Sequence, residues 1–122
     1  MQNIEGSTIS INRGDELNIN LSIKKQDGTN YIYQVGDVVV FCVYKKGKMN
    51  EEAVLLKRIE VPSETESISI NCTNEETKIG EMKNKPIEYW YEIELNDKYT
   101  VIGYDKLGPK LFMLYPEGSQ EI

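Results

Sequence analysis

The densest group of side chains that could do chemistry is acidic, and it lies in residues 87–95. Glu92 and Glu94 in one strand would point the same way, about 6–7 Å apart. Such a pair could bind Ca²⁺ or serve as the acid and nucleophile of a glycosidase. A glycosidase acid, however, needs an apolar pocket that raises its pKa, and no neighbouring segment supplies one on that face. We therefore favour a solvated sheet face, where Glu88, Glu92 and Glu94 pair with lysines of neighbouring strands, and expect no catalytic residue, cofactor or metal.

Trp90 lies among these glutamates, on the side opposite the apolar residues of the same segment. An outward tryptophan can anchor a protein partner, or it can stack on a sugar ring together with a second aromatic residue such as Tyr104. A third reading is that a loop of the same chain covers it. Burying a large aromatic side chain removes ~150–250 Å² from water, worth at most about 4–6 kcal/mol, so such a residue is rarely left bare.

Other catalytic signatures are missing from the sequence. It contains no histidine, and its two cysteines, Cys42 and Cys72, are not in a CxxC motif, which nearly excludes zinc sites and thiol–imidazole pairs. Cys42 lies in an apolar run and reads as a small buried hydrophobe. The Arg13-Gly14-Asp15 triplet reads as a tight turn between two strands rather than as an integrin ligand. We expect that the protein is not an enzyme.

Length and charge set the broad class. The 122 residues predict one domain, residues 1–122, with flexible ends at 1–6 and 119–122. The net charge of −6 argues against binding along a nucleic-acid backbone. No apolar run approaches the ~20 residues that cross a bilayer, and the first residues do not form a signal peptide. We therefore expect no nucleic-acid or membrane partner and an intracellular protein, or one released by lysis or within an assembly.

Alternation of apolar and polar residues is the main structural signal. It is clearest in residues 87–95, where Ile87, Tyr89, Tyr91, Ile93 and Leu95 fall on one side. One helical turn is expected at residues 74–79, capped by Thr73 or Asn74. Strands are predicted at residues 7–12, 16–24, 38–44, 53–61, 67–71, 87–95, 99–104 and 110–115, with a short extended piece at 31–33. This spacing is typical of an antiparallel sandwich or barrel, and we predict an all-β, antiparallel, Ig-like β-sandwich of seven to eight strands.

The segment 38–44 differs from the others because it is apolar on both faces. One face must meet the core, and the other needs cover from a loop, a second layer or another subunit. Either face could be the inner one. The candidate interface residues are Val39, Phe41, Val43 and Tyr44 of this segment, together with Trp90.

Four segments, in this order, carry a resemblance to a known family: Ile-Asn-Arg-Gly-Asp-Glu-Leu-Asn-Ile-Asn-Leu, Val-Val-Val-Phe-Cys-Val-Tyr, Tyr-Trp-Tyr-Glu-Ile-Glu-Leu and Phe-Met-Leu-Tyr-Pro-Glu-Gly. From about residue 9 to residue 118 the chain resembles β-sandwich domains of phage and prophage tails of Gram-positive bacteria, such as the N-terminal domain of baseplate upper proteins. The resemblance implies a structural adaptor that contacts other tail or baseplate proteins and forms homo-oligomers. It implies a location in the virion and, during assembly, in the bacterial host cytoplasm. No coiled coil or receptor-binding region follows the sandwich, so we expect an assembly role rather than host binding.

Two alternatives belong to other functional classes. A carbohydrate-binding module would stack sugars on Trp90 and Tyr104. A small acidic phage inhibitor that mimics nucleic acid would need its carboxylates in a long stripe. A hydrolase ranks last, because histidine and nucleophile motifs are missing from the sequence.

Overall fold

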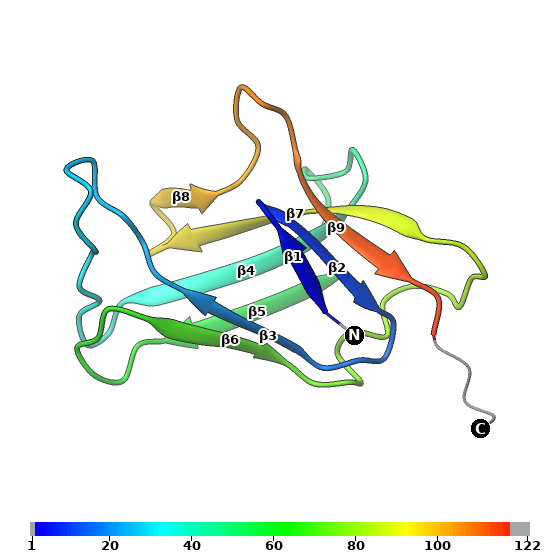
Figure 1. Cartoon of the computed structure of the whole chain (residues 1–122), viewed down its shortest axis with the longest axis horizontal. Coiled ribbons are helices and arrows are strands. Elements are labelled where there is room, and N and C mark those ends of the chain that lie inside the picture. The colour runs from blue at the N-terminus through cyan, green and yellow to red at the C-terminus, as the bar shows by residue number, and fades with distance from the viewer. Residues whose placement is uncertain (1, 118–122) are drawn as a thin grey trace.

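The computed structural model describes residues 2–117, and the side chains of all of these except 3–5. It confirms the all-β prediction (Figure 1). Within the described residues no helix is long and apolar enough to cross a membrane. The strands are β1 (Asn3–Glu5), β2 (Thr8–Asn12), β3 (Leu17–Leu21), β4 (Val38–Lys45), β5 (Leu55–Glu60), β6 (Ile68–Cys72), β7 (Ile87–Leu95), β8 (Tyr99–Ile102) and β9 (Lys110–Tyr115).

The strands form two sheets, and the smaller sheet runs along one face of the larger one (Figure 1). The large sheet has the order β1-β2-β9-β7-β4-β5, and β8 pairs with the second half of β7. The small sheet consists of β3 and β6. This arrangement confirms the sandwich, whereas its Ig-like character stays a prediction.

Two details differ from the prediction. Strand β1 lies within residues 1–6, where the sequence analysis placed no strand, and it pairs with β2. The pairing of β2 with β9 is parallel, so the large sheet is not wholly antiparallel. A parallel pair needs a long connection and leaves no hairpin turn in the sequence, so local patterns do not reveal it. The predicted flexible end at residues 119–122 lies outside the described residues.

The core lies between the two sheets and follows the predicted alternation. The inner face of β7 contributes Tyr89, Tyr91, Ile93 and Leu95, all of which are buried. The other strand side chains of the core cluster come from both layers: Ile9, Ile11, Val39, Phe41, Val43, Leu55, Phe112 and Leu114 from the large sheet, and Leu17, Ile19, Leu21, Ile68, Ile70 and Cys72 from the small one. Val40 and Cys42 of β4 are also buried, but on the opposite face of the large sheet. The two sheets therefore share a single core, to which β2, β3, β4, β5, β6, β7 and β9 contribute buried side chains.

The two faces of β4 are now assigned, and this corrects part of the interface prediction. Val39, Phe41 and Val43 are 0% exposed and belong to the core. They were wrong as candidate interface residues, because a fully enclosed side chain cannot meet a partner. The other face of β4 carries Val40, Cys42 and Tyr44.

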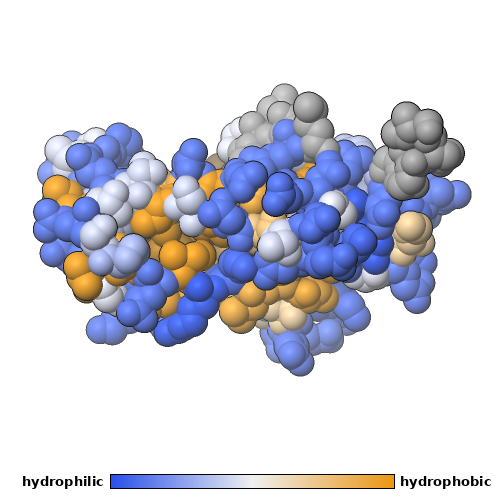
Figure 2. Space-filling model, turned by 90° about the horizontal axis from the view of Figure 1, so that it is seen from below, coloured by the Kyte–Doolittle hydropathy of each residue, from blue (hydrophilic) through white to orange (hydrophobic). Residues whose placement is uncertain are grey.

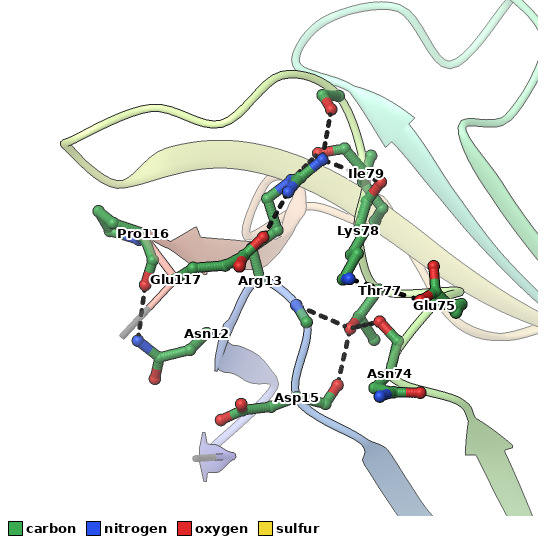
Figure 3. A network of polar contacts seen from close by, with 12 residues as sticks. Asn12, Arg13, Asp15, Asn74, Glu75, Thr77, Lys78, Ile79, Pro116 and Glu117 are labelled. Carbon is green, nitrogen blue, oxygen red and sulfur yellow. Dashed lines mark hydrogen bonds and ion pairs between the residues drawn. The ribbon is translucent and has the colours of Figure 1, made fainter. Parts of the chain in front are cut away.

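The turn that carries the chain from β2 to β3 is held by Arg13 (Figure 3). The Arg13 guanidinium donates hydrogen bonds to the carbonyl oxygens of Ile79 at 3.1 Å and Gly80 at 2.9 Å. It also forms an ion pair with Glu117 at 2.6 Å, and the Arg13 side chain is only 15% exposed. The tight-turn reading is thus supported, since a guanidinium engaged in this way is not available as an integrin ligand.

Thr77 extends this network from the other side of the same corner (Figure 3). Its hydroxyl accepts a hydrogen bond from the Gly14 N–H at 3.1 Å and donates one to the carbonyl oxygen of Asp15 at 2.7 Å. Thr77 is fully buried. The loop between β6 and β7 therefore fixes the position of the β2–β3 turn, and with it the placement of one sheet on the other.

Candidate protein-interaction surface

The large sheet has a second face, which we call the outer face, turned away from β3 and β6. No other described strand covers it, because the only other described sheet lies on the inner side. The register of β5, β4, β7 and β9 places the following side chains on this face: Leu56, Val40, Cys42, Tyr44, Glu88, Trp90, Glu92, Glu94, Leu111 and Met113. The outer face therefore mixes aromatic, aliphatic and acidic residues.

Trp90 lies at the centre of an aromatic group on this face. It is directly opposite Tyr44 on β4 and Leu111 on β9. The ring of Tyr104 meets it edge-on, with centroids 5.8 Å apart and planes at 62°. The Trp90 indole N–H donates a hydrogen bond to Glu88 at 2.7 Å. We call Tyr44, Trp90, Tyr104 and Leu111 the Trp90 cluster.

Trp90 lies on the outer face, as predicted, and Tyr44 of β4 lies next to it. The interface role of both residues stays a prediction. Trp90, Tyr44 and Leu111 are half-buried, whereas Tyr104 is 60% exposed. The structure also brings together the two proposed sugar-stacking residues. Because the rings of Trp90 and Tyr104 are tilted, they do not form a flat platform, and a sugar could lie on only one of them.

The loop between β8 and β9 carries an exposed apolar side chain, Leu107, that was not among the predicted site residues. Asp105 accepts a hydrogen bond from the Leu107 N–H at 2.9 Å and forms an ion pair with Lys110 at 2.8 Å. Backbone hydrogen bonds link Asp105 and Gly108 in both directions. Leu107 is 85% exposed at the tip of this loop, which stands away from the sheets (orange in Figure 1). The sequence feature that could have indicated this exposed leucine is the Asp-Lys-Leu-Gly segment, because Asp and Gly are typical turn residues and turns lie at the surface.

Exposed apolar surface also reaches the β5 edge of the large sheet. Leu56 is 57% exposed there, directly opposite Cys42. Figure 2 views the molecule from the side of β5 and β6, and it shows apolar side chains in separate patches between polar ones. A partner that docks on the outer face would meet Leu56 at one side and the Trp90 cluster at the other.

Burial changes the acid–base properties of the outer face. It raises the pKa of the Tyr44 phenol, and contacts with Cys42 and Glu92 raise it further. The Tyr44 hydroxyl donates to Glu92 at 3.2 Å. Burial also raises the pKa of the Cys42 thiol and, with the nearby charges of Glu92 and Asp97, that of Glu94. Tyr44 and Cys42 are therefore neutral at pH 7 and behave as packing groups.

Basic residues interrupt the acidic side chains of this face. Lys46 lies 3.8 Å from Glu88, and Arg58 lies 3.7 Å from Asp97. Glu88 thus pairs with a lysine as expected, whereas Glu92 accepts a hydrogen bond from Tyr44 instead. The interspersed basic groups differ from the long acidic stripe that a nucleic-acid mimic would need. Within residues 2–117, no three or more His, Cys, Asp or Glu side chains are placed so as to hold a metal ion.

Comparison with known proteins adds no family to this description. No protein-family model matches the chain, and no curated protein matches its sequence.

Proposed function

We propose that this chain is a non-enzymatic structural protein that acts through protein–protein contacts in a phage, or prophage-derived, tail or baseplate. The observation that carries the proposal is the Trp90 cluster, which lies on a sheet face that no other described strand covers. Tryptophan and tyrosine are the residues that most often dominate the energy of an interface when they lie at its centre. The resemblance of the strand and turn pattern to phage tail domains supports the choice of particle.

The surroundings of the cluster support a docking role. The ion pairs of Glu88 with Lys46 and of Arg58 with Asp97 lie on the same face as the aromatic side chains. An apolar centre with a charged rim is the usual plan of an interface between separately folded proteins. The partner is another tail or baseplate protein or a second copy of this chain, in the virion and, before assembly, in the host cytoplasm.

Light scattering on the purified protein and on Trp90→Ala tests this proposal. We expect the wild type to form an oligomer, and we expect Trp90→Ala to weaken it by about tenfold or more, the loss typical of a central aromatic residue. Met82→Ala is the matched control, because Met82 is an apolar side chain that is 60% exposed in the loop before β7. A monomeric wild type, with Trp90→Ala losing only stability, would contradict self-association and assign Trp90 to packing within the chain.

Carbohydrate binding is the second candidate, because the structure places Trp90 and Tyr104 side by side with Glu88 and Glu92 nearby. Trp90 is the only tryptophan of the chain, so its fluorescence reports directly on this surface. A glycan array of bacterial wall sugars, followed by fluorescence titration of wild type and Tyr104→Ala, tests the idea. Binding that depends on Tyr104 would favour it, and silence across the array would end it.

A further inference from the structure

Apart from the outer face, the structure has an apolar groove between β3 and β8, which we call the β3–β8 groove. Two adjoining cavities of about 490 and 900 Å³ form it. They share the residues Leu21, Thr100, Val101 and Ile102. Tyr91, Ile93 and Leu95 of β7 line its base. The groove is therefore a place where the core opens to the surface between two strands.

One wall of the groove is the edge of β3. That edge has no partner strand in the described chain, since β3 pairs with β6 on its other side. The side-chain amide of Gln2 lies on it: Gln2 donates to the Asn18 carbonyl oxygen at 2.6 Å and accepts from the Asn18 N–H at 2.7 Å. These are the two hydrogen bonds that a residue of an antiparallel neighbouring strand would make. The Gln2 side chain thus takes the place of a strand at Asn18.

Asn20 is the next residue along β3 whose backbone N–H and C=O point away from β6. Backbone groups alternate in direction along a strand, so the N–H and C=O of Asn20 point the same way as those of Asn18. Asn20 lines the groove and is exposed. The Gln2 amide does not reach beyond Asn18, so from Asn20 onward the edge of β3 presents its backbone groups to the groove.

The opposite wall is β8, which pairs with β7 and, within the described residues, with no second strand. The pairing with β7 contains an irregularity at Ile93 and Glu94. An open strand edge is a ready template for another strand. The groove therefore runs between two such edges.

The apolar side chains of β3 beside the groove are buried but not completely enclosed. Leu17 is 0% exposed, whereas Ile19 and Leu21 are 8% and 6% exposed. Leu95, across the groove on β7, is 7% exposed. An added strand would cover these side chains with every second residue of its own, because alternate side chains of a strand point to the same face.

The charge at one end of the groove favours an acidic partner. Lys24 and Lys25 line the larger cavity, and no acidic residue is among the described residues that line it. The chain as a whole carries a charge of −6, so this basic end stands out. A carboxylate of a partner would lie within a Debye length of both ammonium groups and be attracted to them.

We propose that the β3–β8 groove binds an extended segment of a partner protein, which adds as a strand to the open edge of β3. The segment places apolar side chains over the base of the groove at alternating positions and an acidic residue beside Lys24 and Lys25. At ~3.3 Å per residue, about five residues span the edge from Asn20 to Lys24. The smaller cavity of the groove reaches Tyr104 of the Trp90 cluster, but strand addition at the edge of β3 does not depend on the function proposed for that cluster.

Two variants of one residue test the mode of binding. Asn20→Pro removes the backbone N–H that faces the groove. The hydrogen bonds between β3 and β6 are made by the residues on either side of Asn20, so they remain. A proline is therefore tolerated at this strand edge. Asn20→Ala is the matched control, because both variants lose the side-chain hydrogen bond between Asn20 and Ser69 and only the proline loses the N–H. Thermal melts establish that both variants are folded before binding is compared.

The probe is a displayed library of seven-residue peptides with one Asp or Glu at either end, selected on the wild-type protein. The enriched peptides are then synthesised with a fluorescent label and titrated by anisotropy. We expect alternating apolar residues in these peptides, and about tenfold weaker binding to Asn20→Pro, with binding to Asn20→Ala within about twofold of wild type. N-methylation of the peptide backbone should weaken binding by a similar factor. When the selection is repeated on the double variant Lys24→Glu, Lys25→Glu, peptides with an acidic end should no longer be enriched.

Three results would overturn the proposal. Peptides that bind wild type and Asn20→Pro equally, or that tolerate N-methylation, would show an apolar pocket without strand addition. If the wild-type protein enriched no peptides beyond those that Asn20→Pro also enriches, the groove would not bind such a segment. A wild-type dimer that Asn20→Pro abolishes would show that the occupant is a second copy of this chain.

Discussion

Replacing Phe41 by alanine is expected to lower the free energy of unfolding by about 3–5 kcal/mol, the usual loss for a large aromatic side chain in a core. Phe41 is 0% exposed. Its ring lies 5.8 Å from that of Tyr91 and 6.3 Å from that of Phe112, so the substitution leaves a cavity in the middle of the large sheet. Urea denaturation followed by circular dichroism measures the change.

Leu56→Ala is the matched control, since Leu56 is on the neighbouring strand and 57% exposed on the outer face. We expect a change within about 0.5 kcal/mol for this exposed position. The pair of variants tests which face of the sheet is the inner one. Equal losses for Phe41→Ala and Leu56→Ala, or a larger loss for Leu56→Ala, would contradict the orientation described here.

Replacing Arg13 by alanine is expected to cost about 2–3 kcal/mol, because hydrogen bonds to a charged group are lost and carbonyl groups at a half-buried corner lose their donor. Arg13→Lys keeps the charge, but it cannot donate to Ile79 and Gly80 while also pairing with Glu117. We therefore expect the lysine variant to recover only part of the loss. Thermal and urea unfolding of the three proteins measure the difference.

Lys78→Ala is the control at the same corner. Lys78 forms an exposed ion pair with Glu75 at 3.4 Å, three residues away in the sequence. Exposed pairs of this kind contribute about 0–1 kcal/mol. If Arg13→Ala were no more destabilising than Lys78→Ala, the Arg13 network would not be holding the two sheets in register.

Much of the fold was predictable because it follows from local patterns. The alternation in β7 identified both of its faces. The Asn96-Asp97 turn has φ values of 55° and 56°, the left-handed geometry of a tight hairpin that asparagine and aspartate tolerate. Residues 74–77 form a turn that does not extend into the expected helical segment 74–79. Thr73 caps this turn: its hydroxyl accepts from the Glu76 N–H at 3.2 Å, and the Glu76 carboxylate accepts from the Thr73 N–H at 2.8 Å. This is the reciprocal pattern of a capping box.

The errors occurred where local pattern carries no information. In β4 both faces are apolar, so nothing in the segment itself distinguishes Val39 from Val40, and only the pairing with β7 assigns them. For the candidate site, the outward position of Trp90 followed from alternation. Its contact with Tyr104 depends on the course of the chain beyond β8, and the exposure of Leu107 depends on a loop held by Asp105 and Lys110. The β3–β8 groove arises from strands that do not pair, which a reading of individual segments cannot detect.

The parallel pairing of β2 with β9 bears on when this protein can fold. Asn12 donates a hydrogen bond to the carbonyl oxygen of Pro116, 104 residues later in the chain. During synthesis, β2 is complete long before β9 leaves the ribosome, and until then its edge has no partner on that side. Contacts so distant in sequence also slow folding, because the chain must close a long loop before it gains them. The nascent chain is thus exposed to strand-pairing errors until β9 is made, and a shortened product that lacks β9 would keep that open edge permanently.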